Sequence, residues 1–280
     1  MCEFIFITIL FVICLQIVTF VTLVMEIDNS KETIAVWFSC GAASAVATYL
    51  TVEKYRETHN ILVLNNPIDE EDEDNLRFKK DIEEWIGIKI IESINTEQNT
   101  TSAEVIWKRR KFMANNQGAP CTMLLKKGAR HEAELKYKID WHVLGFTKEE
   151  EHRHKRFTTF ERKNVIPILI ENVFSKSDCF NFILNAGIKL PRVYEFLDNA
   201  NCIGCVKSSG IDYWQRVRKH YPEIFEKRAV LSRELKCKLV KYNGKRIYLD
   251  ELPLDAKGRK GSRPECSIFC QLPNHKKRVN

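Results

Sequence analysis

The sequence predicts an α/β protein with a doubly wound, mostly parallel β-sheet, followed by a helical C-terminal region that carries cysteines. Short apolar runs at residues 34–38 (IAVWF) and 60–65 (NILVLN) are typical of strands buried on both faces of a sheet. Segments with helical spacing separate these and later runs, which favours right-handed crossovers between parallel strands. In such a sheet, ligands bind at the carboxyl ends of the strands.

Further elements continue this alternation up to about residue 172. We expect strands at 89–94, 141–146 and 166–170, the last weakened by Pro167, and helices at 76–86, 102–113 and 121–137. Beyond residue 172 the pattern is mainly helical. It predicts a helix whose N-terminus is capped by Ser175 and a short helix that begins at Pro191. It also predicts a helical stretch at 211–234 that is interrupted or changes direction at Pro222, and a β-hairpin at 239–248.

The composition is that of a globular chain. Its 280 residues are 44% apolar and 29% charged, enough to bury a core without disulfides. We expect three parts: a hydrophobic segment at 1–24, a nucleotide-binding α/β domain at 25–172, and a helical region with metal-ligand cysteines and a basic tail at 173–280. The net charge of +7 is uneven, with an acidic run at 69–74 and basic runs at 257–263 and 275–278. Such runs are usually solvated; the alternative is a role in holding phosphate or RNA.

The first 24 residues stand apart from the rest. Residues 4–24 carry no charge and are long enough to span a bilayer as a helix, but they lack the basic start and cleavage site of a signal peptide. They are either a signal anchor or single membrane helix, or translation begins at Met25, which we favour. The expectation is a cytoplasmic protein, membrane-anchored only if this segment is expressed.

Six small residues, 39–44 (SCGAAS), connect the first expected strand to a helix. Ser39 and Ser44 offer N–H and hydroxyl donors, and Gly41 allows close backbone approach, so the loop can cradle a phosphate at the helix N-terminus. Cys40 and Ala42 complete the candidate nucleotide loop. The alternative is an ordinary strand-to-helix turn with close packing.

Ten cysteines are present, and four of them form short-range pairs. Cys202 and Cys205 are two residues apart, a spacing that lets both thiolates face one metal ion. Cys266 and Cys270 form a second pair. Such pairs are typical of metal ligands in a reducing compartment rather than of disulfides. The alternative for the first pair is a dithiol without metal.

Five blocks of the sequence, in order, resemble the phosphoadenosine phosphosulfate (PAPS) reductase family of the PP-loop adenine nucleotide α-hydrolase superfamily. The blocks span residues 33–270. They are the loop at 39–44; Asn65-Asn66-Pro67 through Phe78; Gly118 to Thr122 with Leu125 and Lys126; Leu144 to Thr147 with Glu150 and Arg153; and Asn201 to Cys205.

The sequence also departs from the family pattern. A full PP-loop reads Ser-Gly-Gly-x-Asp-Ser, but Cys40 replaces the first glycine and Ala43 the aspartate, which removes a carboxylate that would assist Mg²⁺-dependent attack on an ATP α-phosphate. The reductases carry a C-terminal Glu-Cys-Gly-Leu-His motif. Only its first two residues are present here, as Glu265-Cys266. Cys266 is therefore a candidate nucleophile without its usual neighbours.

The resemblance implies roles for further residues. Lys126 and Arg153 would neutralise a sulfate or phosphate, where fixed cations act most strongly. Asn65 or Asp69 would meet the ribose or adenine at the end of the second strand. A four-iron iron–sulfur cluster (4Fe-4S) would be held by Cys121, Cys202, Cys205 and one of Cys266 or Cys270. A zinc site formed by Cys202, Cys205, Cys266 and Cys270 is the alternative.

The expected function is therefore reduction, or sulfur transfer, of a sulfated adenine nucleotide, with Cys266 as nucleophile and a thioredoxin-like reductant as partner. An ATP-dependent sulfur transferase or adenylating enzyme that acts on a nucleic acid is the runner-up, favoured by the basic stretch at 107–111. A catalytically inactive nucleotide-binding or redox-sensing module is the alternative of another class. The oligomeric state does not follow from the sequence.

Overall fold

The computed structural model describes residues 27–115 and 118–258. The hydrophobic segment at 4–24 and the cysteines Cys266 and Cys270 lie outside these residues. Within the described ranges, no helix is both long and apolar enough to cross a membrane.

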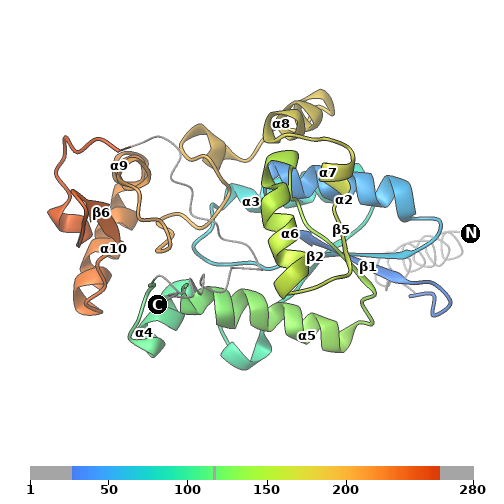
Figure 1. Ribbon diagram of the computed structural model, residues 1–280, viewed down its shortest axis with the longest axis horizontal. Coiled ribbons are helices and arrows are strands. Elements are labelled where there is room, and N and C mark those ends of the chain that lie inside the picture. Colours follow the sequence, from blue (N-terminus) through green and yellow to red (C-terminus); the bar gives the residue numbers. More distant parts are fainter. Residues whose placement is uncertain (1–26, 116–117, 259–280) are drawn as a thin grey trace, which may run out of the picture.

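Five parallel strands form the central sheet in the order β3-β2-β1-β4-β5. Figure 1 shows this sheet with helices on both sides. The bounds of the strands are β1 Thr33–Phe38, β2 Asn60–Asn65, β3 Ile90–Glu92, β4 Trp141–Val143 and β5 Val165–Ile166. The chain moves outward from β1 to β3 and then returns to the other side of β1, which makes the boundary between β1 and β4 the topological switch point. The predicted α/β class with a parallel sheet is confirmed.

Helices cover both faces of this sheet. Alternate residues of β1 divide between them: Ile34, Val36 and Phe38 belong to one apolar cluster, and Ala35 and Trp37 to another. The first cluster includes residues of α2 (Ala42–Tyr55), α3 (Asp74–Ile86), α7 (Ile168–Glu171) and α8 (Lys176–Asn185), and the second includes residues of α5 (Gly128–Lys136) and α6 (Glu151–Phe160). Burial on both faces explains why β1 reads as a continuous apolar run.

Several elements are shorter than the sequence predicts. The expected strand at 166–170 is wrong beyond Ile166, because Pro167 cannot donate to a ladder and the next residues form α7. The strand expected to reach residue 146 ends at Val143. The helix expected at 102–113 is α4 (Ala103–Arg110), which stops where Lys111 adopts a left-handed conformation. The helix expected at 121–137 begins as a π-helix, Thr122–Lys127, before α5.

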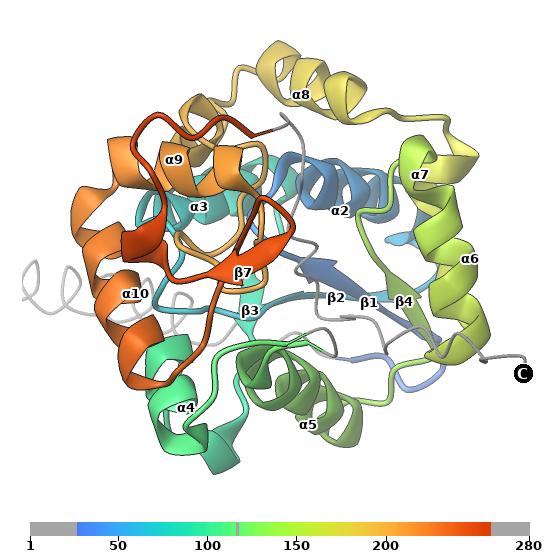
Figure 2. The same cartoon turned by 60° about the vertical axis from the view of Figure 1, so that its left-hand side comes forward.

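The C-terminal region packs around a third apolar cluster that contains the buried rings of Trp107 and Trp214. Its elements are α9 (Ile211–His220), α10 (Pro222–Glu234) and the antiparallel hairpin of β6 (Val240–Tyr242) and β7 (Lys245–Ile247), seen together in Figure 2. Pro222 separates the two helices, as predicted. Short 3-10 helices at Thr96–Gln98, Lys148–Glu150, Arg192–Glu195 and Leu249–Glu251 complete the described elements.

Part of the acidic run at 69–74 is built into the fold rather than solvated. The Glu70 carboxylate accepts hydrogen bonds from the Ser102 hydroxyl and from the N–H groups of Ala103 and Glu104, and so caps the N-terminus of α4. Asp72 is buried and accepts from Arg192 at 2.8 Å and from the Tyr221 hydroxyl. The usual expectation of a solvated run is thus wrong for these carboxylates, because their partners lie far away in the sequence.

Candidate functional site

A cavity of about 380 Å³ opens at the carboxyl ends of β1 and β4, beside the topological switch point. Its walls come from six parts of the chain: the end of β1 with the β1–α2 loop, the segment after β2, Lys126 of the π-helix, the β4–α6 segment, Lys176 of α8, and the segment from Tyr194 to Asn201. Five of the predicted site residues line it: Ser39, Gly41, Ser44, Lys126 and Arg153. The fold therefore brings together residues that lie up to 114 positions apart in the chain.

The β1–α2 loop is held by its own side chains. The Ser44 hydroxyl donates to the Gly41 carbonyl at 2.8 Å, and it accepts from the Ser39 N–H at 3.1 Å and from the Ser39 hydroxyl. Gly41 is extended and precedes the first turn of α2 at Ala42. The small residues thus fix a tight entry into a helix of 14 residues, whose N-terminal N–H groups favour an anion nearby.

Cys40 lies in the loop but turns away from the cavity. Its φ of 55° is left-handed, a conformation that favours glycine, which is the residue expected at this position in a full PP-loop. The thiol is buried beside Asn65, whose side-chain amide lies 3.6 Å from Sγ. Burial raises the pKa of the Cys40 thiol well above its usual range, so this cysteine stays neutral at pH 7.

The β4–α6 segment approaches the loop very closely at Gly145. A Cβ atom placed there would lie 2.7 Å from the Ser44 nitrogen and 2.8 Å from the Ala43 carbonyl carbon. Two residues further, the Thr147 N–H donates to Glu150, which also binds the Arg153 guanidinium. Gly145 therefore sets the distance between the two walls, and Glu150 orients Arg153.

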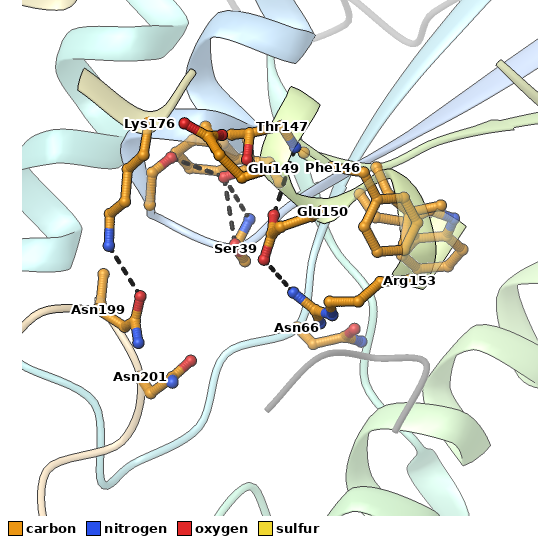
Figure 3. Close-up of a pocket in the computed structure, with 18 of the residues that line it drawn as sticks. Ser39, Asn66, Phe146, Thr147, Glu149, Glu150, Arg153, Lys176, Asn199 and Asn201 are labelled. Carbon is orange, nitrogen blue, oxygen red and sulfur yellow. Dashed lines mark hydrogen bonds and ion pairs between the residues drawn. The ribbon is translucent and has the colours of Figure 1, made fainter. Parts of the chain in front are cut away.

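Three cations line the cavity: Lys126, Arg153 and Lys176. In Figure 3, Lys176 and Arg153 lie on opposite sides of Ser39. Lys126 is buried and 3.5 Å from Glu71, and Lys176 donates to the Asp198 carbonyl and to the Asn199 amide oxygen. Lys126 belongs to the π-helix, an irregularity that often marks functional sites. Each cation is thus already oriented, and an anion would enter by competing with these oxygens.

Further cavity residues had no role assigned from the sequence, among them Asn66, Lys176, Tyr194, Asn199 and Asn201. Asn66 follows the expected Asn65 by one position, and Asn201 directly precedes the first cysteine of the Cys202–Cys205 pair. Tyr194 is the least expected, because its hydroxyl accepts the Ala42 N–H at 3.1 Å across 152 residues. This bond ties the segment that leads to Cys202 to the start of α2.

Asn65 and Asp69 lie away from the cavity lining. The Asn65 side chain is buried and donates to the Phe38 carbonyl at 2.9 Å, which supports the end of β1 from below the loop. Asp69 accepts from the Thr101 hydroxyl. The two side chains nearest to them in sequence that do line the cavity are Asn66 and Glu71.

The predicted metal ligands are placed in part. Cys202 and Cys205 are buried in the third apolar cluster, and Cys121 packs against the same cluster. Gly204, between the paired cysteines, is left-handed with φ 69°, which makes the tight turn that such a pair needs. Within the described ranges, no three His, Cys, Asp or Glu side chains are grouped to hold a metal ion. A metal centre at this pair would need further ligands, for which Cys121, Cys266 and Cys270 are the candidates.

Comparisons with known proteins leave the family open. No protein-family model matches the sequence, and no curated protein matches it significantly. The resemblance to the PAPS reductase family stays a prediction that rests on the five sequence blocks.

Proposed function

We propose that the protein binds an adenine nucleotide in the cavity between β1 and β4 and acts as a PAPS reductase-like enzyme. One observation carries the nucleotide part of the proposal. The small-residue loop before α2 and three cations share a cavity at the switch point of a parallel sheet, where ligands of such folds bind. The loop N–H groups and the cations suit a phosphate or sulfate group.

The loop favours a ligand that is already sulfated over ATP that must be activated. Ala43 takes the place of the PP-loop aspartate, so the loop itself offers no carboxylate for Mg²⁺. Three carboxylates do line the cavity, and each is engaged. Glu71 lies against Lys126, Glu150 binds Thr147 and Arg153, and Glu149 accepts from the Thr147 side chain and the Lys176 backbone. The hydroxyls of Ser39 and Ser44 remain close to the phosphate-binding end of α2.

The proposed reaction is attack of a cysteine thiolate, with Cys266 as the candidate, on the sulfur atom of the sulfated nucleotide. A sulfur–sulfur bond forms as the sulfur–oxygen bond breaks, and the nucleotide phosphate leaves with the electron pair. A thioredoxin-like dithiol then attacks the cysteine sulfur and releases sulfite while it is oxidised to a disulfide. In the cavity, Lys126, Arg153 and Lys176 would stabilise the charge on the leaving phosphate.

A metal centre held by Cys202 and Cys205 belongs to the same proposal. With Cys121 and one of Cys266 or Cys270 they would hold a four-iron cluster; with Cys266 and Cys270 they would hold zinc. When bound, such a centre would add charge near the nucleotide and lower the pKa of a nearby thiol. Iron and zinc analysis of anaerobically purified full-length protein distinguishes the two, because about four irons per chain support the cluster and one tight zinc contradicts it.

The full-length protein is expected to release sulfite from PAPS when thioredoxin and its reductase are supplied, and Cys266→Ser is expected to abolish release while keeping nucleotide binding. Cys237→Ser is the matched control, because Cys237 is a buried packing residue of the third cluster, and it should keep turnover. Pyrophosphate release from ATP in the presence of RNA or DNA would instead establish the ATP-dependent alternative. Nucleotide binding without turnover of PAPS or ATP would instead favour a catalytically inactive nucleotide-binding or redox-sensing module.

A further inference from the structure

We propose that the C-terminal region binds the backbone of double-stranded DNA through a basic ridge formed by Lys111, Lys236, Lys238, Lys241, Lys245 and Arg246. All six side chains belong to exposed residues. This proposal is independent of the nucleotide cavity, because none of the six lines it.

The ridge begins where two helices end side by side. Arg228 of α10 binds Glu104 of α4 at 2.8 Å, and the Cys237 thiol donates to the Ala114 carbonyl at 3.3 Å. The first contact joins α4 to α10, which lie side by side in Figure 2, and the second joins the segment after α4 to the segment after α10. Lys111 and Lys236 are therefore carried by neighbouring parts of one surface.

Both of these lysines occupy positions where glycine is favoured. Lys111 follows α4 with φ 48°, and Lys236 follows α10 with φ 51°. A left-handed conformation is unfavourable for a residue with a Cβ atom, so each lysine is kept at a cost to stability. The partial negative charge of a helix C-terminus offsets part of this cost, but it does not account for the cations of the hairpin that follows.

The hairpin places like charges opposite one another. Lys241 lies opposite Arg246 across the strands, which sets two positive charges side by side. Residues 235–249 contain five cations and no aspartate or glutamate. The Arg246 guanidinium reaches back to the carbonyls of Lys238 and Leu239, which keeps these charges together.

The two-stranded hairpin favours duplex DNA among the polyanions. A two-stranded β-ribbon fits the major groove of B-form DNA, whereas the major groove of A-form RNA is too deep and narrow. Single strands are bound on exposed aromatic rings. Tyr242 and Tyr248 are half-buried, and the Tyr248 ring is covered by Arg233 and Lys238. The ridge therefore presents charge without a stacking platform.

Fluorescence anisotropy with a labelled 25-base-pair duplex tests the proposal on the full-length chain. We expect micromolar binding at about 50 mM salt that weakens steeply by about 200 mM. The double variant Lys111→Gly with Lys236→Gly is expected to melt about 2–4 °C higher, because glycine relieves both left-handed positions. It should also bind DNA about three- to tenfold more weakly. The slope of the logarithm of the binding constant against the logarithm of the salt concentration should be smaller in magnitude by about 1–2. Higher stability with weaker binding cannot arise from misfolding.

Two controls separate charge from backbone conformation. Val173→Gly relieves another exposed left-handed residue without removing charge, so it should raise the melting temperature and leave DNA affinity unchanged. Lys155→Glu removes an exposed lysine on α6, away from the hairpin in both views, and should weaken DNA binding far less than Lys241→Glu. Wild-type affinity in the double variant, equal losses in the two glutamate variants, or tighter binding of single-stranded RNA or anionic vesicles would overturn the proposal.

Discussion

Replacing Gly145 with alanine is expected to weaken adenine nucleotide binding by tenfold or more and to lower the free energy of unfolding by about 1–3 kcal/mol. The added Cβ atom would lie 2.7 Å from the Ser44 nitrogen and 3.0 Å from its Cα atom. Both are backbone atoms in the first turn of α2, so no side-chain rotation relieves the contact. The wall that carries Thr147 and Arg153 must move away from the loop.

Gly87→Ala is the matched control for this variant. Gly87 ends α3 with φ 67°, and a Cβ atom there would meet nothing within 4 Å. The substitution is expected to cost about 1–2 kcal/mol through the left-handed conformation alone and to leave nucleotide affinity unchanged. Isothermal titration calorimetry and chemical denaturation measure the two effects. Equal affinities of Gly145→Ala and the wild type would contradict the close approach of the two walls.

The stability of the protein is expected to fall by about 3 kcal/mol as the pH drops from 6.5 to 4, because of His142. Burial lowers the pKa of His142 to about 4, with Arg162 and Arg130 acting in the same direction and Glu134 opposing them. The unfolded chain then binds a proton between these pH values that the folded chain does not. The contribution is present above pH 6.5 and is lost as the pH falls toward 4.

His142→Gln tests this assignment. The Trp37 indole donates to Nδ1 of His142 at 3.1 Å, and a glutamine oxygen can accept the same bond without titrating. Urea denaturation between pH 4 and 7 should show a flatter pH dependence in this variant. His131→Gln, at an exposed histidine of α5, should keep the wild-type slope. An unchanged slope in His142→Gln would mean that other groups dominate the acid response.

The central sheet and the turn from β1 into α2 could be predicted because their signals are local. β1 is buried on both faces and reads as an unbroken apolar run, and Gly87 and Pro222 mark helix boundaries within one or two residues. The close approach of Gly145 to Ser44 is not visible in the sequence, since it depends on the pairing of β1 with β4.

The rest of the cavity depends on contacts between distant parts of the chain. Tyr194 reaches Ala42 across 152 residues, and Glu70 caps a helix 33 residues further on. Nothing in the sequence next to Glu70 or Tyr194 indicates which distant residue each side chain will contact. Arg153 and Lys126 were found only because they belong to blocks that resemble a family, and the sequence alone left their partners Glu150 and Glu71 without a role.

Hydrogen–deuterium exchange with and without adenosine 3′,5′-bisphosphate tests the central claim most directly, because it reports where a nucleotide binds. Under saturating nucleotide, backbone amides of residues 39–46 at the start of α2 and of residues 144–150 after β4 should exchange more slowly, since both segments line the cavity. The hairpin at 240–247 should exchange as before. Saturable binding without protection of either cavity segment would contradict a nucleotide site between β1 and β4.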